Sequence, residues 1–380
     1  IKNSSFDTTK ISKLTEQITS IKHTLAKWKK DQLRPFFPWK LHFSEVFSDK
    51  NGFDVVIANP PYGADIDKNE KKVLRQQLVN TRNTNSAAMF IDFGKNHLLN
   101  PNGALSFIVP KSLLYSELWY DLVEALLGKT KILVDVEKAF DKVLLEQVVF
   151  VFGNALPTNS YYAKKFLNNK FLQTTKITND TVDLFKAWVC DVTEEELDIA
   201  KKITTSRDTI LMSEISDTKR GVGLQKFIKD SSDIPVIGGK NIFRYGLDGY
   251  KGYLSKSDFN SNSSKVSFMN QPKIMSQNIV AHIQNPKPHI QIIATLDLTG
   301  DILNLDTVNN TIITNSDYQY EYVLALLNST FVSWYCYKFI FCSAVRTMHF
   351  DNKYIGKIPV PKLDPEAQSS IISAVRKLME

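Results

Sequence analysis

Residues 52–62 read Gly-Phe-Asp-Val-Val-Ile-Ala-Asn-Pro-Pro-Tyr, and this stretch decides the fold. The apolar, β-branched run at 53–58 predicts a buried strand. The two prolines that follow lack an N–H group, so we expect them to end that strand. Asn59 and Tyr62 are thereby placed at the carboxyl edge of a strand, which is where open α/β sheets bind their ligands.

The composition bounds the class of protein. The chain has 380 residues, enough for two domains with cores of their own, and 43% of them are hydrophobic. No apolar run reaches the roughly 18 residues that a membrane span needs. The net charge of +7 suits a polyanionic partner such as nucleic acid. Three cysteines without a C-x-x-C pair predict free thiols in a reducing cytoplasm.

Apolar runs at 104–109, 131–136 and 146–152 predict three more strands, which alternate with helices at 86–99 and 112–127. Alternating strands and helices predict an α/β fold. Because a short turn separates the last two strands, we expect them to form an antiparallel hairpin.

The first segment predicts a helix. Its apolar residues recur at alternating steps of three and four, at Ile11, Leu14, Ile18, Ile21, Leu25 and Trp28. We expect this seam to pack on its own domain, because too few heptads are present to favour an intermolecular coiled coil.

The second half differs from the first. From about residue 212 it shows short strand-like runs separated by glycine-rich turns, and it closes with an amphipathic helix, which together predict an α+β domain. The predicted organisation is an N-terminal helical segment at 1–40, a sheet domain at 41–155, a linker at 156–211 and a second domain at 212–380.

The residues after the first strand suit a particular chemistry. The amide oxygen of Asn59 and the carbonyl of Pro60 are two acceptors in fixed geometry, which suit the two hydrogens of an exocyclic amine. Holding the amine in this way directs its lone pair outward, toward an electrophile. Tyr62 offers a flat face on which a base can stack. The alternative is a simple turn that ends the strand.

Residues 52–63 closely resemble motif IV of the adenine-N6 DNA methyltransferases, and the order of parts resembles the gamma class and its type IIG restriction–modification relatives. This resemblance implies the C-terminal half of a Rossmann-like methyltransferase sheet, followed by an α+β target-recognition domain. It assigns the target adenine, flipped out of the duplex, to Asn59, Pro60, Pro61 and Tyr62. It also implies S-adenosylmethionine as the methyl donor and no metal.

Two further stretches carry the resemblance. Residues 85–90 lie where the family places motif V, so Phe90 would line the cofactor site together with Asn59 and Pro61. Residues 136–150 resemble motif VIII, in which Phe140 would pack on the other face of the flipped base. The alternative for Phe140 is an ordinary core position.

The second half resembles the family's specificity domain, on residues 235–245 and 357–361. The resemblance implies double-stranded DNA as the partner, without predicting which bases are read. Contacts with phosphates or base edges are expected from five polar or basic residues, for which a solvated surface is the alternative: Lys240, Arg244, Lys273, Gln277 and Arg346.

One departure from the family is large. No glycine precedes Gly52, so the glycine-rich cofactor turn and any nuclease motif are missing. We therefore expect a C-terminal fragment with an incomplete cofactor pocket, an upstream methyltransferase and nuclease segment, and a bacterial cytoplasmic location. The family places strands four, five, seven and six side by side, which would leave the strand before Asn59 as an exposed edge.

The sequence thus predicts site-specific DNA adenine-N6 methylation by a restriction–modification enzyme. A non-catalytic DNA-binding specificity module is the first alternative. Methylation of RNA or of a protein amide by a similar motif is the second.

Overall fold

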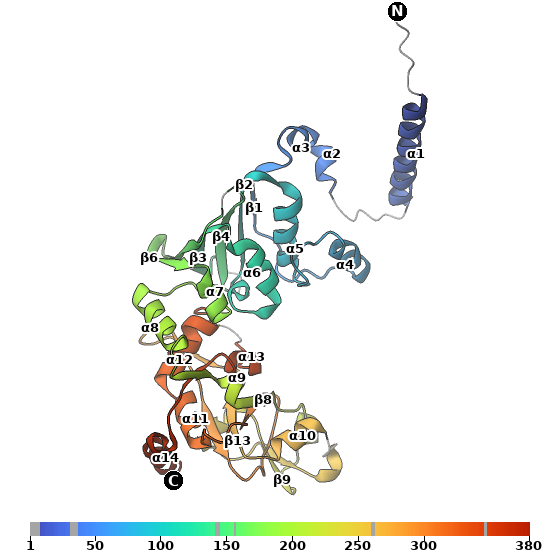
Figure 1. Ribbon diagram of the computed structural model, residues 1–380. Helices are drawn as coiled ribbons and strands as arrows, with labels where there is room; N and C mark the ends of the chain where they lie inside the picture. Colours follow the sequence, from blue (N-terminus) through green and yellow to red (C-terminus); the bar gives the residue numbers. More distant parts are fainter. Residues whose placement is uncertain (1–7, 31–36, 141–144, 156, 260–262, 346–347) are drawn as a thin grey trace, which may run out of the picture.

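The structure is a computed structural model that describes residues 8–30, 37–140, 145–155, 157–259, 263–345 and 348–380. Two halves are stacked end to end, and helix α1 (Thr8–Lys30) stands apart from both (Figure 1). Among the described residues, no helix is long and apolar enough to cross a membrane.

The first half is built on a six-stranded sheet in the order β1-β2-β4-β3-β5-β6. Strands β1 and β2 are parallel, β4 is antiparallel to both of its neighbours, and β3 is parallel to β5. The order of the first four strands confirms the predicted Rossmann-like half-sheet. The strands are Phe53–Ala58 (β1), Leu99–Pro110 (β2), Thr130–Glu137 (β3), Gln147–Gly153 (β4), Ser160–Leu167 (β5) and Lys170–Thr178 (β6).

The helices of this half confirm the α/β class. Helix α5 buries Ala87, Ala88 and Ile91, and it belongs to the same apolar core as Phe107 of β2 and Phe150 of β4. The helices are Trp39–His42 (α2), Ser44–Lys50 (α3), Lys68–Arg75 (α4), Ser86–Phe93 (α5), Tyr120–Leu127 (α6), Asp180–Phe185 (α7) and Glu194–Thr204 (α8).

Strand β1 is the edge of the sheet, as the resemblance to the family's strand order implies, and the prediction of a buried strand at 53–58 is wrong. Its side chains remain open to solvent: Val55 is 58% exposed and Ile57 is 76% exposed. An apolar edge strand with unpaired backbone groups is a ready template for another chain segment.

The segment at 156–211, which the sequence predicts to be a linker, instead extends the sheet through β5 and β6. Although the segment is polar in composition, buried and exposed side chains alternate along it, with Tyr161 buried, Tyr162 exposed and Ala163 buried. This alternation every second residue is typical of a half-buried strand. A capping box between Thr193 and Glu196 then opens α8.

The second half combines small sheets with helices. A four-stranded sheet in the order β16-β13-β18-β8 lies next to a three-stranded sheet in the order β12-β9-β17. The strands are Thr209–Leu211 (β7), Ser216–Arg220 (β8), Ile234–Ile237 (β9), Ile242–Phe243 (β10), Gly246–Leu247 (β11), Gly252–Leu254 (β12), Lys273–Gln277 (β13), Ala281–Ile283 (β14), His289–Gln291 (β15), Ala294–Asp297 (β16), Leu303–Asn304 (β17), Val308–Ile313 (β18) and Pro359–Pro361 (β19). The helices are Met212–Ile215 (α9), Ser264–Met269 (α10), Tyr320–Leu327 (α11), Thr330–Tyr335 (α12), Asn352–Ile355 (α13) and Pro365–Met379 (α14).

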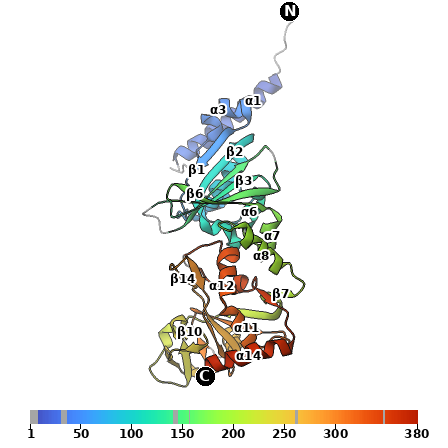
Figure 2. The same cartoon turned by 90° about the vertical axis from the view of Figure 1, so that its left-hand side faces the viewer.

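One apolar core joins the two halves. Phe150 and Trp188 from the sheet side belong to the same buried cluster as Phe339 and Phe341 from the second half. Figure 2 shows α12 pointing from the second half toward α7 and α8. The halves are therefore packed against each other through buried side chains.

The packing expected for the N-terminal helix is wrong. On α1, the seam residues Ile11, Leu14, Ile18 and Ile21 are each half or more exposed. The apolar seam of α1 is therefore not packed against the other described parts of the chain.

Lys273, expected at the DNA surface, lies fully buried in β13. Its ammonium group pairs with Asp297 of β16 and donates to the carbonyl of Met269 at 2.6 Å. Asp297 also accepts from the backbone N–H groups of Gly300 and Ile302. The pair is thus a structural element of the four-stranded sheet.

Replacing Lys273 should test this assignment. Lys273→Ala leaves the Asp297 carboxylate buried without its counter-charge, and should lower the free energy of unfolding by roughly 3–5 kcal/mol, measured by urea denaturation. The matched control is Lys219→Ala in β8, whose side chain is 45% exposed and pairs with Asp217 at the surface. It should cost less than about 1 kcal/mol. Equal losses in the two variants would contradict the buried pair.

Candidate functional site

The site begins where β1 stops pairing. Ala58 lies opposite Phe107 of β2, and the prolines then end the ladder. Asn59 is exposed just beyond the strand, Pro60 is buried and Pro61 is exposed. The structure therefore places the Asn59 side chain at the carboxyl edge of the sheet.

The hydroxyl of Tyr62 holds the Asn59 amide. It lies 3.1 Å from the Oδ1 atom of Asn59 and 3.1 Å from the carbonyl oxygen of Ile108 in β2. Partial burial raises the pKa of Tyr62, so the hydroxyl keeps its proton at neutral pH and acts as a donor. The sequence indicates a stacking role for this ring and gives no signal for the positioning contact.

The backbone after the prolines is fixed by helix α5. The Ser86 hydroxyl donates to the Pro61 carbonyl at 2.6 Å and accepts from the N–H of Ala64 at 3.1 Å. Asn85 caps the same helix by accepting from the N–H of Ala87. Because the loop is tied at this point, the conformation of Asn59 and its neighbours does not depend on the prolines alone.

Phe90 lines an apolar pocket beside the open edge of the sheet. The pocket has a volume of about 400 Å³, and it is lined by Ala58 of β1 together with Phe90 and Phe107. An apolar wall next to the strand that carries the motif fits the flat ring of a nucleoside cofactor. The backbone donors of a glycine-rich turn are absent from the sequence before Gly52. The described chain therefore offers an apolar pocket beside the motif, lined by β1, β2, α4 and α5.

Phe140 lies on the same edge of the sheet, but at a distance from Asn59. It follows β3, which is separated from β1 by β2 and β4, or about 14 Å at the usual strand spacing. The ring is partly exposed, and among the described residues no ring contact joins it to Tyr62. The structure thus puts the two aromatic residues on one edge without bringing them together.

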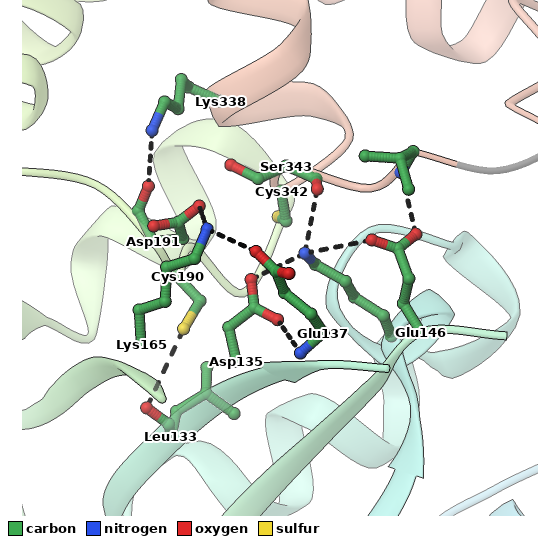
Figure 3. A network of polar contacts seen from close by, with 12 residues as sticks. Leu133, Asp135, Glu137, Glu146, Lys165, Cys190, Asp191, Lys338, Cys342 and Ser343 are labelled. Carbon is green, nitrogen blue, oxygen red and sulfur yellow. Dashed lines mark hydrogen bonds and ion pairs between the residues drawn. The ribbon is translucent and has the colours of Figure 1, made fainter. Parts of the chain in front are cut away.

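A charged cluster that the sequence analysis missed occupies this edge (Figure 3). Lys111, just after β2, donates to Asp135 of β3 at 2.7 Å and to the carbonyl of Ser343 at 2.9 Å. Glu146, just before β4, lies 3.7 Å from the same ammonium group. Asp135, an aspartate inside the apolar run of β3, is the signal in the sequence that could have revealed this cluster.

The cluster holds more negative than positive charge around Lys111. Burial alone would lower the pKa of Lys111, but the carboxylates of Asp135 and Glu146 outweigh it and raise that pKa. Burial raises the pKa of Glu146, which is the more distant of the two carboxylates. Lys111 and Asp135 therefore form the ion pair, and Glu146 is the carboxylate with the weaker partner.

The residues expected to contact DNA fall into three groups. The amide nitrogen of Gln277 donates to the carbonyls of Gly239 and Ile242, so its hydrogens are used within the protein and are not available to DNA. Lys240 and Arg244 are exposed, although one guanidinium nitrogen of Arg244 donates to the carbonyl of Asn328. Arg346 lies outside the described residues.

A surface pocket of about 520 Å³ surrounds Lys240. It is also lined by Gly238, Gly239 and Lys251. The two exposed ammonium groups of Lys240 and Lys251 suit a contact with an anionic chain. Lys240 is thus an exposed residue beside a surface pocket, as a contact with DNA requires.

Two protein families match this chain. Residues 1–140 match the family described as Eco57I restriction-modification methylase, and residues 234–360 match the TaqI-like C-terminal specificity domain. A protein of Methanocaldococcus jannaschii described as a type II restriction enzyme and methyltransferase is 26% identical over 335 residues. That alignment covers 80% of this chain and 26% of the relative, so the chain spans about a quarter of the length of this curated protein.

Three solved structures show partial similarity. The type IIL restriction-modification enzyme MmeI in complex with DNA is 11% identical, with a TM-score of 0.48 over 78% of this chain and 45% of that chain. The DrdV–DNA complex is 12% identical, with a TM-score of 0.48. The match covers 90% of this chain and 45% of that chain. The type IIG restriction endonuclease BpuSI is 13% identical, with a TM-score of 0.36 over 85% and 49%.

Removing the Tyr62 hydroxyl should release the Asn59 amide. Tyr62→Phe should lower the free energy of unfolding by about 1 kcal/mol, because the Ile108 carbonyl and the Asn59 amide lose their donor. Tyr162→Phe in β5 is the matched control: that ring is 49% exposed, and its loss of a hydroxyl should cost less than about 0.5 kcal/mol. Thermal unfolding measures both. A neutral Tyr62→Phe would show that the hydroxyl does not tie the motif to β2.

Proposed function

We propose that this chain, which combines a segment of the Eco57I restriction-modification methylase family with a TaqI-like C-terminal specificity domain, holds the target adenine of a DNA (adenine-N6) methyltransferase and recognises its DNA sequence. The observation that carries the proposal is the position of Asn59. Its amide lies at the carboxyl edge of the sheet and is held there by Tyr62.

The chain's own residues supply the amine-holding half of the reaction. The Asn59 oxygen and the Pro60 carbonyl accept the two hydrogens of the adenine amino group. Neutral acceptors keep the amine from losing a proton early, and its lone pair points away from both of them. Nitrogen then forms a bond to a methyl carbon, the bond from that carbon to its leaving group breaks, and the extra proton of the nitrogen passes to solvent.

Tyr62 contributes in two ways. Its hydroxyl fixes the plane of the Asn59 amide, and its partly exposed ring offers a face to the base. The adenine must leave the DNA stack to reach these groups, since its amino group is inaccessible within the duplex. Stacking on an aromatic ring offsets part of the energy lost on flipping.

S-adenosylmethionine is the cofactor that fits this chemistry, because it supplies an electrophilic methyl group. The apolar pocket lined by Phe90 and Ala58 would hold its adenine ring beside the motif.

DNA recognition is assigned to the second half. The TaqI-like specificity domain and the net charge of +7 both suit a polyanionic partner. Lys240 and Arg244 are exposed on this half and suit contacts with phosphates or base edges.

A non-catalytic DNA-binding module is the second candidate function. The open edge of β1 favours it for this chain in isolation, because a sheet that ends there lacks the rest of a cofactor site. Calorimetry of the chain with S-adenosylmethionine separates the two functions: clear binding would contradict a module without a cofactor site.

Replacing Asn59 tests catalysis directly. In the full-length protein, Asn59→Ala should lower adenine-N6 methylation by roughly 100-fold or more, because one fixed acceptor of the reacting amine is lost. DNA affinity should stay within about threefold, since binding depends on many contacts. Asn69→Ala on the exposed face of α4 is the control and should leave both unchanged. Full methylation by Asn59→Ala would exclude the proposed role.

The salt dependence of binding tests DNA recognition. The logarithm of the association constant should fall with the logarithm of salt concentration, with a slope of about −0.9 for each phosphate contact. Lys240→Ala should make that slope shallower by about 1, measured by fluorescence anisotropy on a duplex. Lys377→Ala in the terminal helix is the control. A flat salt response of the unaltered chain would contradict DNA binding.

A further inference from the structure

A polar pocket of about 710 Å³ lies between the sheet edge and the second half. Glu137 and Glu146 line it from the sheet side, at the end of β3 and the start of β4. His282, Gln284 and Asn285 line it from β14 and the loop that connects β14 to β15. The pocket therefore lies at the junction of the catalytic and specificity halves.

Two residues that line the pocket each carry a buried polar atom without a hydrogen-bond partner among the described residues. Ser343 lines it and is only 3% exposed, yet its hydroxyl has no hydrogen-bond partner among the described residues. The Nε2 atom of His282 is also buried and, within the same part of the chain, unpartnered. Buried polar groups without partners are rare and unfavourable. The volume is far larger than the roughly 30 Å³ of one water molecule, so the pocket suits a larger polar group.

The charges around the pocket favour a donor over an anion. Lys111 pairs with Asp135, and Lys165 bridges Glu137 and Asp191 at 2.9 and 3.0 Å. Glu146 is the remaining carboxylate, and the exposed ammonium group of Lys138 also lines the pocket. The carboxylates of Asp135, Glu137, Glu146 and Asp191 therefore outnumber the lysines Lys111, Lys138 and Lys165 by one. One oxygen of Glu146 accepts from the N–H of Val345, and the other lies 3.7 Å from the ammonium group of Lys111. A phosphate would meet this excess of negative charge, whereas an N–H donor would relieve it.

The side chains match the edge of a particular kind of base. A glutamate accepts from the N4 amino group of cytosine, and asparagine or glutamine pairs with the N6 and N7 atoms of adenine. Glu146, Gln284 and Asn285 therefore all favour a base that carries an exocyclic amino group. The exposed position of Gln284 and Asn285 at the loop leaves them free to approach a groove.

The pocket lies close enough to the Asn59 site to share one stretch of DNA. Strands β1 and β3 run in the same direction, so Asn59 and Glu137 lie at the same edge. The strand spacing separates them by about 14 Å. At about 3.4 Å per base step, this corresponds to roughly four steps along the duplex.

We propose that this pocket reads one cytosine or adenine of the recognition sequence, with Glu146 accepting from the amino group and Ser343 and His282 completing the hydrogen bonds of the base. The inference rests on the proposed function, because it requires DNA to lie between the halves. It places a base-reading residue, Glu146, on the sheet side, outside the residues that match the specificity domain.

The experiment begins by selecting bound sequences from a randomised duplex pool with the full 380-residue chain. At one cytosine or adenine of the selected site, replacement by 2-pyrimidinone or purine, which lack the amino group, should weaken binding about 10-fold. Glu146→Gln should weaken binding of the selected site by a similar factor, but should not weaken binding of the duplex without that amino group.

Ser343→Ala gives a second variant with little risk to folding, because it removes a hydroxyl that has no partner among the described residues. It should weaken binding of the selected site by roughly 3- to 10-fold while leaving the unfolding temperature unchanged. Ser276→Ala is the matched control. Its hydroxyl in β13 is equally buried and, within the described chain, unpartnered, but does not line the pocket, so binding should not change.

The outcomes separate the two proposals. If the unaltered chain shows no sequence-selective, salt-dependent DNA binding, the proposed function fails and this inference fails with it. If the chain selects a sequence but Glu146→Gln and Ser343→Ala bind every duplex as the unaltered chain does, the inference alone is overturned.

Discussion

The buried ammonium group of Lys111 is the contact on which the arrangement of the two halves depends. It follows β2, pairs with Asp135 of β3 and donates to the Ser343 carbonyl of the second half. A charge removed from water must be paired and hydrogen-bonded. Separating these partners would therefore leave a buried charge without compensation, which costs free energy. The polar contact therefore fixes an alignment that the surrounding apolar core alone would specify less strictly.

That alignment gives the sheet edge its two functional regions. At one end, Tyr62 and Ser86 fix the motif of Asn59 by contacts to β2 and α5. At the other end, the second half closes a polar pocket over β3 and β4. Both regions lie at the edge of the sheet where β1 and β3 end and where the antiparallel strand β4 begins. A base held at one end and a base read at the other would thus be positioned by one rigid sheet.

The same sheet is open on its other side. Strand β1 exposes Val55 and Ile57, and the pocket lined by Phe90 lies beside this open edge. The part of the proposed reaction that belongs to this chain is holding the amine and reading the DNA.

The sequence by itself determined the strands around Asn59, because apolar runs reflect local burial. Their order in the sheet and the exposed edge followed only from the resemblance to the adenine-N6 methyltransferases. The sequence also pointed to Asn59 and Tyr62, since a strand that ends in prolines leaves a recognisable pattern. Only the tertiary structure decided that Lys273 and Gln277 are committed inside the fold, that residues 156–211 extend the sheet, and that Lys111, Glu146 and Ser343 meet. Those residues are far apart in the chain, and the burial of a charged or polar side chain depends on partners that local sequence does not specify.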